Sequence, residues 1–253
     1  MRNLEFFEEI EHPEVPWGER TVYVPVFYYD VMRMGALFVA PLTKLKGWMP
    51  SPRMYPLRLT PWHGAVSIAA MEYRDSDIGP YNEVSISVPF TLDMPTPIFT
   101  GILRKAPEEP SAFIRHLPVT TEIARDLGVE FAGYPKIHAS IEFENEAGWI
   151  TCHVAEDDQH ILSFAGRQLE NRLVPRSRMQ LFTSRNGRLL RSEMMVSERQ
   201  QAASKRAADV QLTLGDHPIA QELKAISLGR MLDYQYTPQH QCILTPVIES
   251  FAM

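Results

Sequence analysis

Apolar and polar residues alternate along much of the chain, which predicts a protein built mainly from short strands. Apolar side chains occupy every second position of residues 137–143, and the same period of two runs through residues 84–90. The apolar positions are Ile137, Ala139, Ile141 and Phe143 in the first segment and Val84, Ile86, Val88 and Phe90 in the second. A period of two is typical of a strand with one buried face.

Further strands are predicted where β-branched and aromatic residues cluster between turn residues. These ranges are Arg20–Tyr28, Met34–Ala40, Gly64–Tyr73, Phe113–Val119, Trp149–Ala155, His160–Leu169 and Cys242–Ile248. Asn186-Gly187 is typical of a two-residue hairpin turn, and it joins Met179–Arg185 to Arg188–Met195. Because strands and helices do not alternate regularly, the pattern favours a large antiparallel sheet curled into a barrel over a parallel sheet.

Three short helices are expected at the periphery. The first is Lys44–Met49, with Thr43 as its cap; the second begins after Thr120 and ends at Gly128; the third is Asp216–Leu228, with Pro218 near its start. For Glu198–Asp209, which is charged and rich in alanine, loop and helix both remain open.

No linker or internal repeat divides the sequence, so we expect residues 1–253 to form a single domain. Residues 1–18 contain several glutamates and two prolines, and we expect them to form an arm on the surface or on another subunit. Proline-rich loops are predicted at Asp93–Pro97 and Ala106–Pro110.

Composition and charge narrow the classes of partner. The chain has 31 acidic and 25 basic residues, a net charge of −6, and no basic stripe, which excludes nucleic acid as an expected partner. An anionic substrate therefore needs a local cation. The two isolated cysteines, the acidic N-terminal segment and the lack of any run of about 18 apolar residues lead us to expect a cytoplasmic protein without a membrane span.

Candidate chemistry lies in two turns that each precede a strand. Gly133-Tyr134-Pro135 places Lys136 at the first position of one strand, and Gly79-Pro80-Tyr81-Asn82 precedes Glu83 on another. A lysine on a polar strand face is most often solvated. If that face lines a closed cavity instead, desolvation keeps part of the lysine as a free amine, which attacks a carbonyl and forms a Schiff base.

These two turns and their strands, GPYNE and GYPK in this order, resemble the acetoacetate decarboxylase superfamily. The resemblance extends roughly from Asp30 to the C-terminus. It implies that Lys136 forms the Schiff base, that Glu83 shares its pocket, and that an arginine near the start of an early strand binds the substrate carboxylate. Arg33 and Arg20 both fit the last role, and the spacing to Met34–Ala40 favours Arg33. The resemblance also implies a β-barrel-like domain with peripheral helices, commonly a homo-oligomer.

The chain departs from the family pattern after the lysine. The decarboxylase proper carries a second lysine there, and a cationic neighbour activates the first. Here this position is Ile137, so activation of Lys136 must come from burial. The missing second lysine disfavours acetoacetate as the substrate, but it does not disfavour Schiff-base chemistry. A second pocket acid on the strand before Glu83 has no match either, since Ile68 is at the counted position and Glu72 lies four residues further on.

The functional hypothesis is a lyase that decarboxylates a small or medium β-oxo acid through a lysine imine. Lys136 and Glu83 are the candidate catalytic residues, and the candidate substrate contacts are Arg33, Tyr81, Tyr134 and His138. For His138 a structural role remains the alternative. The eight histidines show no metal-ligand spacing and no nucleotide motif occurs, so we expect neither metal nor cofactor. A lysine-imine aldolase or dehydratase and a non-catalytic ligand-binding barrel remain alternative functions.

Overall fold

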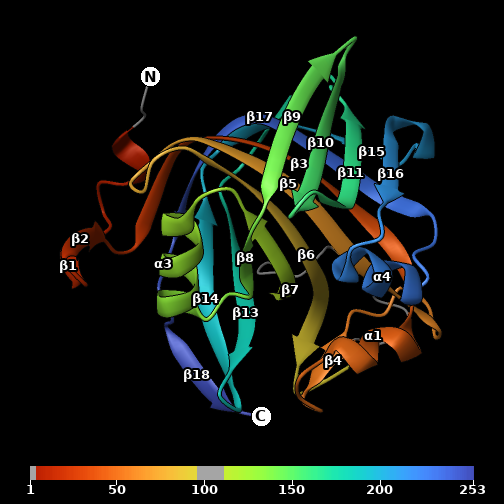
Figure 1. The fold of residues 1–253 in the computed structure, drawn as a ribbon, viewed down its shortest axis with the longest axis horizontal. Coiled ribbons are helices and arrows are strands. Elements are labelled where there is room, and N and C mark those ends of the chain that lie inside the picture. Colours follow the sequence, from red (N-terminus) through yellow and green to blue (C-terminus); the bar gives the residue numbers. More distant parts are fainter. Residues whose placement is uncertain (1–3, 96–110) are drawn as a thin grey trace.

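A computed structural model describes residues 4–95 and 111–253 of the chain (Figure 1). The predicted loop Ala106–Pro110 and the end of Asp93–Pro97 lie outside the described residues. None of the helices within these ranges is long and apolar enough to cross a membrane.

Among the described residues, seven strands pair in succession and close on themselves as a barrel. In the order of pairing they are β17 (Met231–Leu244), β3 (Val26–Pro41), β5 (His63–Ser76), β6 (Tyr81–Leu92), β7 (Ser111–Val119), β13 (Ser177–Arg185) and β14 (Arg188–Val196), which pairs with β17 again. All these pairs are antiparallel except β7–β13, which is parallel. The predicted curled, mainly antiparallel sheet is confirmed.

The other elements extend or cover this barrel. β8 (Lys136–His138) pairs with β7, and β4 (Met54–Pro56), β15 (Arg199–Ser204), β12 (Arg172–Val174) and β18 (Glu249–Ala252) extend the same sheet. A second sheet contains β9 (Ser140–Glu146), β10 (Trp149–Glu156), β11 (Gln159–Arg167) and β16 (Val210–Leu214). The remaining elements are the hairpin β1 (Glu14–Trp17) and β2 (Arg20–Tyr23), the 3-10 turns η1 (Leu4–Phe6) and η2 (Ala207–Asp209), and the helices α1 (Leu42–Trp48), α3 (Glu122–Ala132) and α4 (Pro218–Ala225).

The barrel wall separates two apolar cores. The outer core lies between β3, β5 and β6 and the second sheet, and it includes Met34, Ile68, Ile86 and Phe164. The helices α1 and α4 border this core on the right of Figure 1, whereas α3 lies on the left. The inner core lies on the other face of the same strands and extends to α3, and its members include Val31, Met71, Val119 and Cys242. Alternate residues of the same strands thus face different cores.

The region of Lys136 differs from the predicted single strand over residues 137–143. It forms two strands, β8 and β9, which belong to different sheets, with Ala139 between them. The amide of Ala139 still donates to the carbonyl of Val119, after which the chain leaves β7. The predicted apolar face is confirmed nonetheless, since Ile137, Ala139, Ile141 and Phe143 all belong to the outer core.

The prediction for the second helix was wrong at both ends. Its cap is Thr121, whose side chain accepts from the amide of Ala124, and the helix continues through Gly128 to Ala132. It ends at Gly133, which adopts the left-handed conformation with φ of 63°. Gly128 lies in the helix interior despite its low helix propensity, because the helix is capped by Thr121 and buries one face that includes Ala124 and Leu127.

Several other boundaries follow from local structure. The predicted Asn186-Gly187 hairpin is confirmed, with φ of 51° and 73° at the two turn residues. The first helix begins at Leu42 rather than after Thr43, because Pro41 occupies its N-cap position. Glu198–Asp209, for which loop and helix were open, contains strand β15 and turn η2. Phe7 of the N-terminal arm packs on Phe27 and Ile243 of the barrel wall.

Replacing Ile137 tests the assignment of its face. The variant Ile137→Lys introduces an unpaired charge at the outer core, so we expect the free energy of unfolding to fall by at least about 2 kcal/mol. Ile137→Leu is the matched control and is expected to lower it by less than about 1.5 kcal/mol. Urea denaturation of the three proteins measures the difference, and equal stability of Ile137→Lys and wild type would show that residue 137 faces water.

Candidate functional site

Lys136 and Glu83 meet inside the protein. The Nζ atom of Lys136 lies 2.9 Å from Oε2 of Glu83, and the two side chains are only 4% and 8% exposed. Lys136 comes from β8, opposite Leu117 of β7, and Glu83 comes from β6. The two sequence motifs, 53 residues apart, therefore deliver their charged residues to one place.

The turn before Lys136 directs the chain out of α3 and into β8. The amide of Tyr134 donates to the carbonyl of Gly128, and the amide of Lys136 donates to the carbonyl of Tyr134. Pro135, between them, has a fixed φ angle and no amide hydrogen. It is therefore well suited to the position immediately before a strand. This local geometry places Lys136 against β7.

Four tyrosines surround the ion pair. The hydroxyl of Tyr73 donates to Oε1 of Glu83 at 3.2 Å, so both carboxylate oxygens have a partner. The ring centroids of Tyr81 and Tyr134 lie 5.5 and 5.9 Å from Nζ of Lys136, within the range of cation–π contacts. The hydroxyl of Tyr28 is 3.2 Å from that of Tyr81.

Burial keeps these phenols protonated. It is the main cause that raises the pKa of Tyr28, Tyr73 and Tyr81 well above the usual range, and the nearby charge of Glu83 raises each pKa further. Burial likewise raises the pKa of Tyr134, whose hydroxyl lies 2.7 Å from Oγ of Ser192. The tyrosines therefore act as neutral hydrogen-bond donors and ring walls around the pair.

Gly128 of α3 lies directly against the lysine side chain. A Cβ atom at this position would come within 2.6 Å of Cε and 2.7 Å of Cδ of Lys136. A larger residue at position 128 would therefore require the flexible end of the Lys136 side chain to move from its present position.

Arg33 shares a row with Glu83 across three neighbouring strands. Glu83 of β6 is opposite Met71 of β5, and Met71 is opposite Arg33 of β3. Residues in register on successive strands face the same side, so Arg33 points to the face of Glu83, with its backbone about 10 Å away along the wall. Its Nη1 lies 3.5 Å from Oε1 of Gln235, and burial lowers its pKa below the usual range.

The other residues considered from the sequence lie away from the pair of Lys136 and Glu83. Arg20 is exposed on β2, opposite Trp17, away from the barrel interior. His138 is exposed as well, with its Nε2 3.1 Å from the carbonyl oxygen of Thr120. Ile68 belongs to the outer core, and Glu72 pairs with Arg74 at 2.7 Å. Thus Lys136, Glu83, Tyr81 and Tyr134 come together, Arg33 shares their face, and His138 lies apart.

Sequence reasoning missed Tyr28, Tyr73 and Gly128. Tyr73 precedes its partner Glu83 by ten residues on the adjacent strand, and a hairpin prediction with the register Tyr73–Tyr81 would have indicated it. Tyr28 is separated from the regular part of β3 by a bulge at Asp30, which conceals its face. Gly128 carried only a helix-stop signal.

The described residues contain no group of three or more His, Cys, Asp and Glu side chains arranged to hold a metal ion. The reactive groups of this site are the amine of Lys136 and the carboxylate of Glu83.

The fold is similar to that of several solved structures. No curated protein sequence matches the chain. An acetoacetate decarboxylase from Legionella pneumophila has 14% identity, with 98% of this chain and 94% of that chain covered and a TM-score of 0.65. A second acetoacetate decarboxylase structure has 12% identity, 94% and 90% coverage and a TM-score of 0.63. The enduracididine biosynthesis enzyme MppR, complexed with the condensation product of pyruvate and imidazole 4-carboxaldehyde, has 12% identity, 92% and 95% coverage and a TM-score of 0.57.

At these identities the structural matches establish the fold. The family follows from the sequence, because the model of the acetoacetate decarboxylase family matches residues 54–240, which include both Glu83 and Lys136. The chain therefore belongs to the acetoacetate decarboxylase family.

Proposed function

We propose that this protein is a lyase that decarboxylates a small or medium β-oxo acid through an imine on Lys136. The observation that carries the proposal is the buried contact of 2.9 Å between Nζ of Lys136 and Oε2 of Glu83. A lysine held in a desolvated place beside a proton acceptor is suited to nucleophilic attack on a carbonyl.

The reaction begins when Glu83 accepts a proton from Lys136. The neutral amine attacks the ketone carbonyl and a carbon–nitrogen bond forms. The carbonyl oxygen then takes the proton held by Glu83 and leaves as water, which gives a protonated imine. This imine is an electron sink. The bond to the carboxylate carbon then breaks, its electron pair moves into the imine to form an enamine, and carbon dioxide leaves. Protonation of the enamine and hydrolysis release the ketone and restore Lys136.

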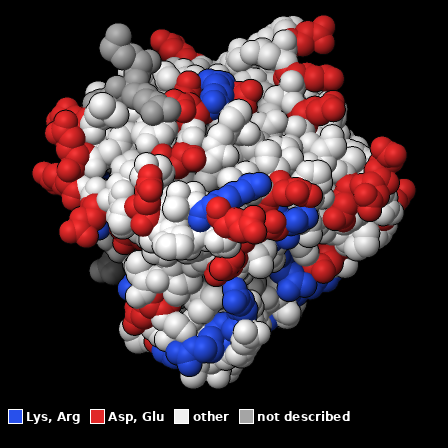
Figure 2. All heavy atoms as spheres, turned by 60° about the vertical axis from the view of Figure 1, so that its left-hand side comes forward, with Lys and Arg blue, Asp and Glu red and all other residues white. Residues whose placement is uncertain are grey.

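Arg33 is proposed to hold the substrate carboxylate. A planar guanidinium binds both oxygens of a carboxylate at once, which orients the bond that breaks. A local cation is needed because the whole chain has a net charge of −6. Figure 2 shows acidic side chains spread over much of one face, with basic ones across its middle and in its lower part. The row from Glu83 through Met71 supports this role for Arg33 over Arg20.

The tyrosines and Gly128 are proposed to keep the pair in a reactive position. Tyr73 holds one oxygen of Glu83 and leaves the other for Lys136. The rings of Tyr81 and Tyr134 cover Nζ and exclude water. Exclusion of water strengthens the electrostatic interactions among the groups that remain.

Aldol chemistry is the second candidate, because the same imine and enamine also support carbon–carbon bond formation. Two observations favour it: the outer-core position of Ile137 leaves no second lysine in the pocket, and MppR, of similar fold, is described with a condensation product of pyruvate. A binding barrel without turnover is the alternative from another class. Product analysis separates the first two, and covalent trapping separates both from the third.

Trapping with borohydride tests the imine. Incubation with a panel of oxo-acids and borohydride should add the mass of the reduced adduct to Lys136, because borohydride reduces an imine to a stable amine. Lys136→Ala should lose the adduct, whereas Lys46→Ala, which removes an exposed lysine, should retain it. Mass spectrometry of the intact and digested protein locates the adduct. Trapping in Lys136→Ala, or none with any oxo-acid, would falsify the Schiff-base proposal.

Replacing the glutamate tests its role as proton acceptor. Glu83→Gln keeps the size of the side chain but cannot accept the proton, so turnover should fall by about 10²-fold or more. Glu142→Gln on β9, where the side chain is exposed, is the matched control and should leave turnover unchanged. Steady-state kinetics with the substrate found by trapping gives the comparison. Equal turnover of Glu83→Gln and wild type would rule out this role.

Gly128→Ala tests the packing that positions the lysine. The added Cβ displaces Lys136, and we expect the trapping rate to fall by about 10²-fold, since small misplacements of a reacting group have large effects. Alanine favours a helix over glycine by about 1 kcal/mol, so weakening of α3 is not the cause. Gly47→Ala in α1 is the control, because nothing lies within 4 Å of a Cβ there. If both variants react at the wild-type rate, the contact has no functional role.

A further inference from the structure

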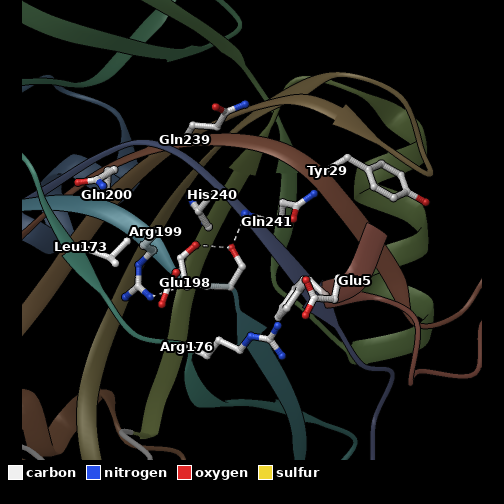
Figure 3. Close-up of a pocket in the computed structure, with 12 residues that line it drawn as sticks. Glu5, Tyr29, Leu173, Arg176, Glu198, Arg199, Gln200, Gln239, His240 and Gln241 are labelled. Carbon is white, nitrogen blue, oxygen red and sulfur yellow. Dashed lines mark hydrogen bonds between the residues drawn. The ribbon is translucent and has the colours of Figure 1, made fainter. Parts of the chain in front are cut away.

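A pocket opens at the barrel wall where it passes from β14 to β15. Its volume is about 460 Å³, and Figure 3 shows Arg176, Arg199 and His240 among the side chains that line it. Both β14 and β15 pair with β17, and β17 has register shifts on either side of His240. The pocket therefore lies at an irregular part of the barrel wall.

The guanidinium of Arg199 has only neutral partners among the hydrogen bonds of the described residues. Its Nε donates to Oε1 of Gln201 at 3.1 Å, and its Nη1 lies 3.2 to 3.3 Å from the carbonyl oxygens of Pro175 and Ser197 and from Oγ of Ser177. These bonds hold the side chain in place, but none of them neutralises its charge. A partly buried cation of this kind is normally paired with an anion.

His240 lies next to this arginine with an unpaired nitrogen. Its side chain is 6% exposed, and Nδ1 has no hydrogen-bond partner within the described part of the chain. Burial and the charges of Arg33 and Arg199 lower the pKa of His240 to about 3, so the ring is neutral. Buried polar atoms without a partner are rare in proteins and indicate a missing ligand or water.

Sheet register relates this pocket to the proposed site of Lys136 across neighbouring strands of the barrel wall. His240 is opposite Val31, which is opposite Tyr73, the residue that donates to Glu83. Thr237 is opposite Arg33, and its hydroxyl lies 3.5 Å from the oxygen of Gln201 that Arg199 also contacts.

Arg199 differs from the other two cations of this region in having no carboxylate partner among the described residues. Lys136 pairs with Glu83, and the charge of Asp233 acts on Arg33, which in the proposed function also takes the carboxylate of the reacting group. The two glutamates that line the pocket, Glu5 and Glu198, are exposed, so water screens their charges.

We propose that the substrate is an oxo-diacid whose distal carboxyl group binds between Arg199 and His240. The proposal rests on the proposed function, because it extends the substrate of the same site. The distal carboxylate pairs with the guanidinium of Arg199, and its negative charge beside the ring favours a proton on His240, so that Nδ1 then donates to the carboxylate. Arg176, across the pocket, adds a positive charge at the entrance.

The test compares two probes of nearly equal size that differ by one charge, 3-oxoglutarate and its monomethyl ester. Borohydride trapping on Lys136 is measured against probe concentration for each. We expect the half-saturating concentration to be at least about tenfold lower for the diacid, a usual effect of one hydrogen bond to a charged group. This comparison in the wild-type protein does not depend on any variant.

Variants then assign the preference. Arg199→Gln should abolish the difference between the two probes, and because this residue also holds neighbouring segments, His240→Phe provides a second test that should reduce it. Equal half-saturating concentrations for the diacid and the ester in wild type would overturn the oxo-diacid while leaving the imine proposal intact. A preference that survives both variants would overturn the assigned position. Absence of any adduct would reject the proposed function and this inference with it.

Discussion

The buried ion pair of Lys136 and Glu83 is the interaction on which the arrangement of the barrel interior depends. Removing two charges from water costs several kcal/mol for each ion, and their attraction offsets this only when the geometry is good and the remaining atoms are hydrogen-bonded. Tyr73 supplies the hydrogen bond to the second carboxylate oxygen. Loss of one partner leaves the other charge buried and unpaired, which typically lowers the free energy of unfolding by about 3–5 kcal/mol. The pair therefore constrains β6, β8 and the tyrosines around it.

The same constraint suits the proposed chemistry. When the proton moves from lysine to glutamate, two buried charges disappear together, so the reactive amine forms without leaving an isolated ion in the barrel. A second lysine next to Lys136 is absent, because residue 137 is an isoleucine, and its side chain packs against the outer core. In this chain the carboxylate beside the lysine, and not a neighbouring cation, is the group available to prepare the amine.

The net charge of the chain and the charge on part of the barrel wall have opposite signs. The chain as a whole is acidic, while Arg33 and Arg199 present positive charge on neighbouring parts of the interior. Long-range attraction of an anion is therefore weak, and recognition depends on short-range contacts inside a partly desolvated space. In the proposed function, a substrate with its own negative groups supplies the carboxylates for these arginines.

Local chemistry in the sequence determined the strand content, the Asn186-Gly187 hairpin, and the delivery of Lys136 and Glu83 by their turns, because alternation and turn residues act over a few neighbours. It did not determine where the strand after Lys136 divides between two sheets, since that depends on β7. Only the tertiary structure aligned Glu83, Met71 and Arg33 in one row, because register between strands distant in sequence is set by packing. Only the tertiary structure also shows the contact of Gly128. Its low helix propensity can be read from the sequence, whereas its packing against the side chain of Lys136 from β8 cannot.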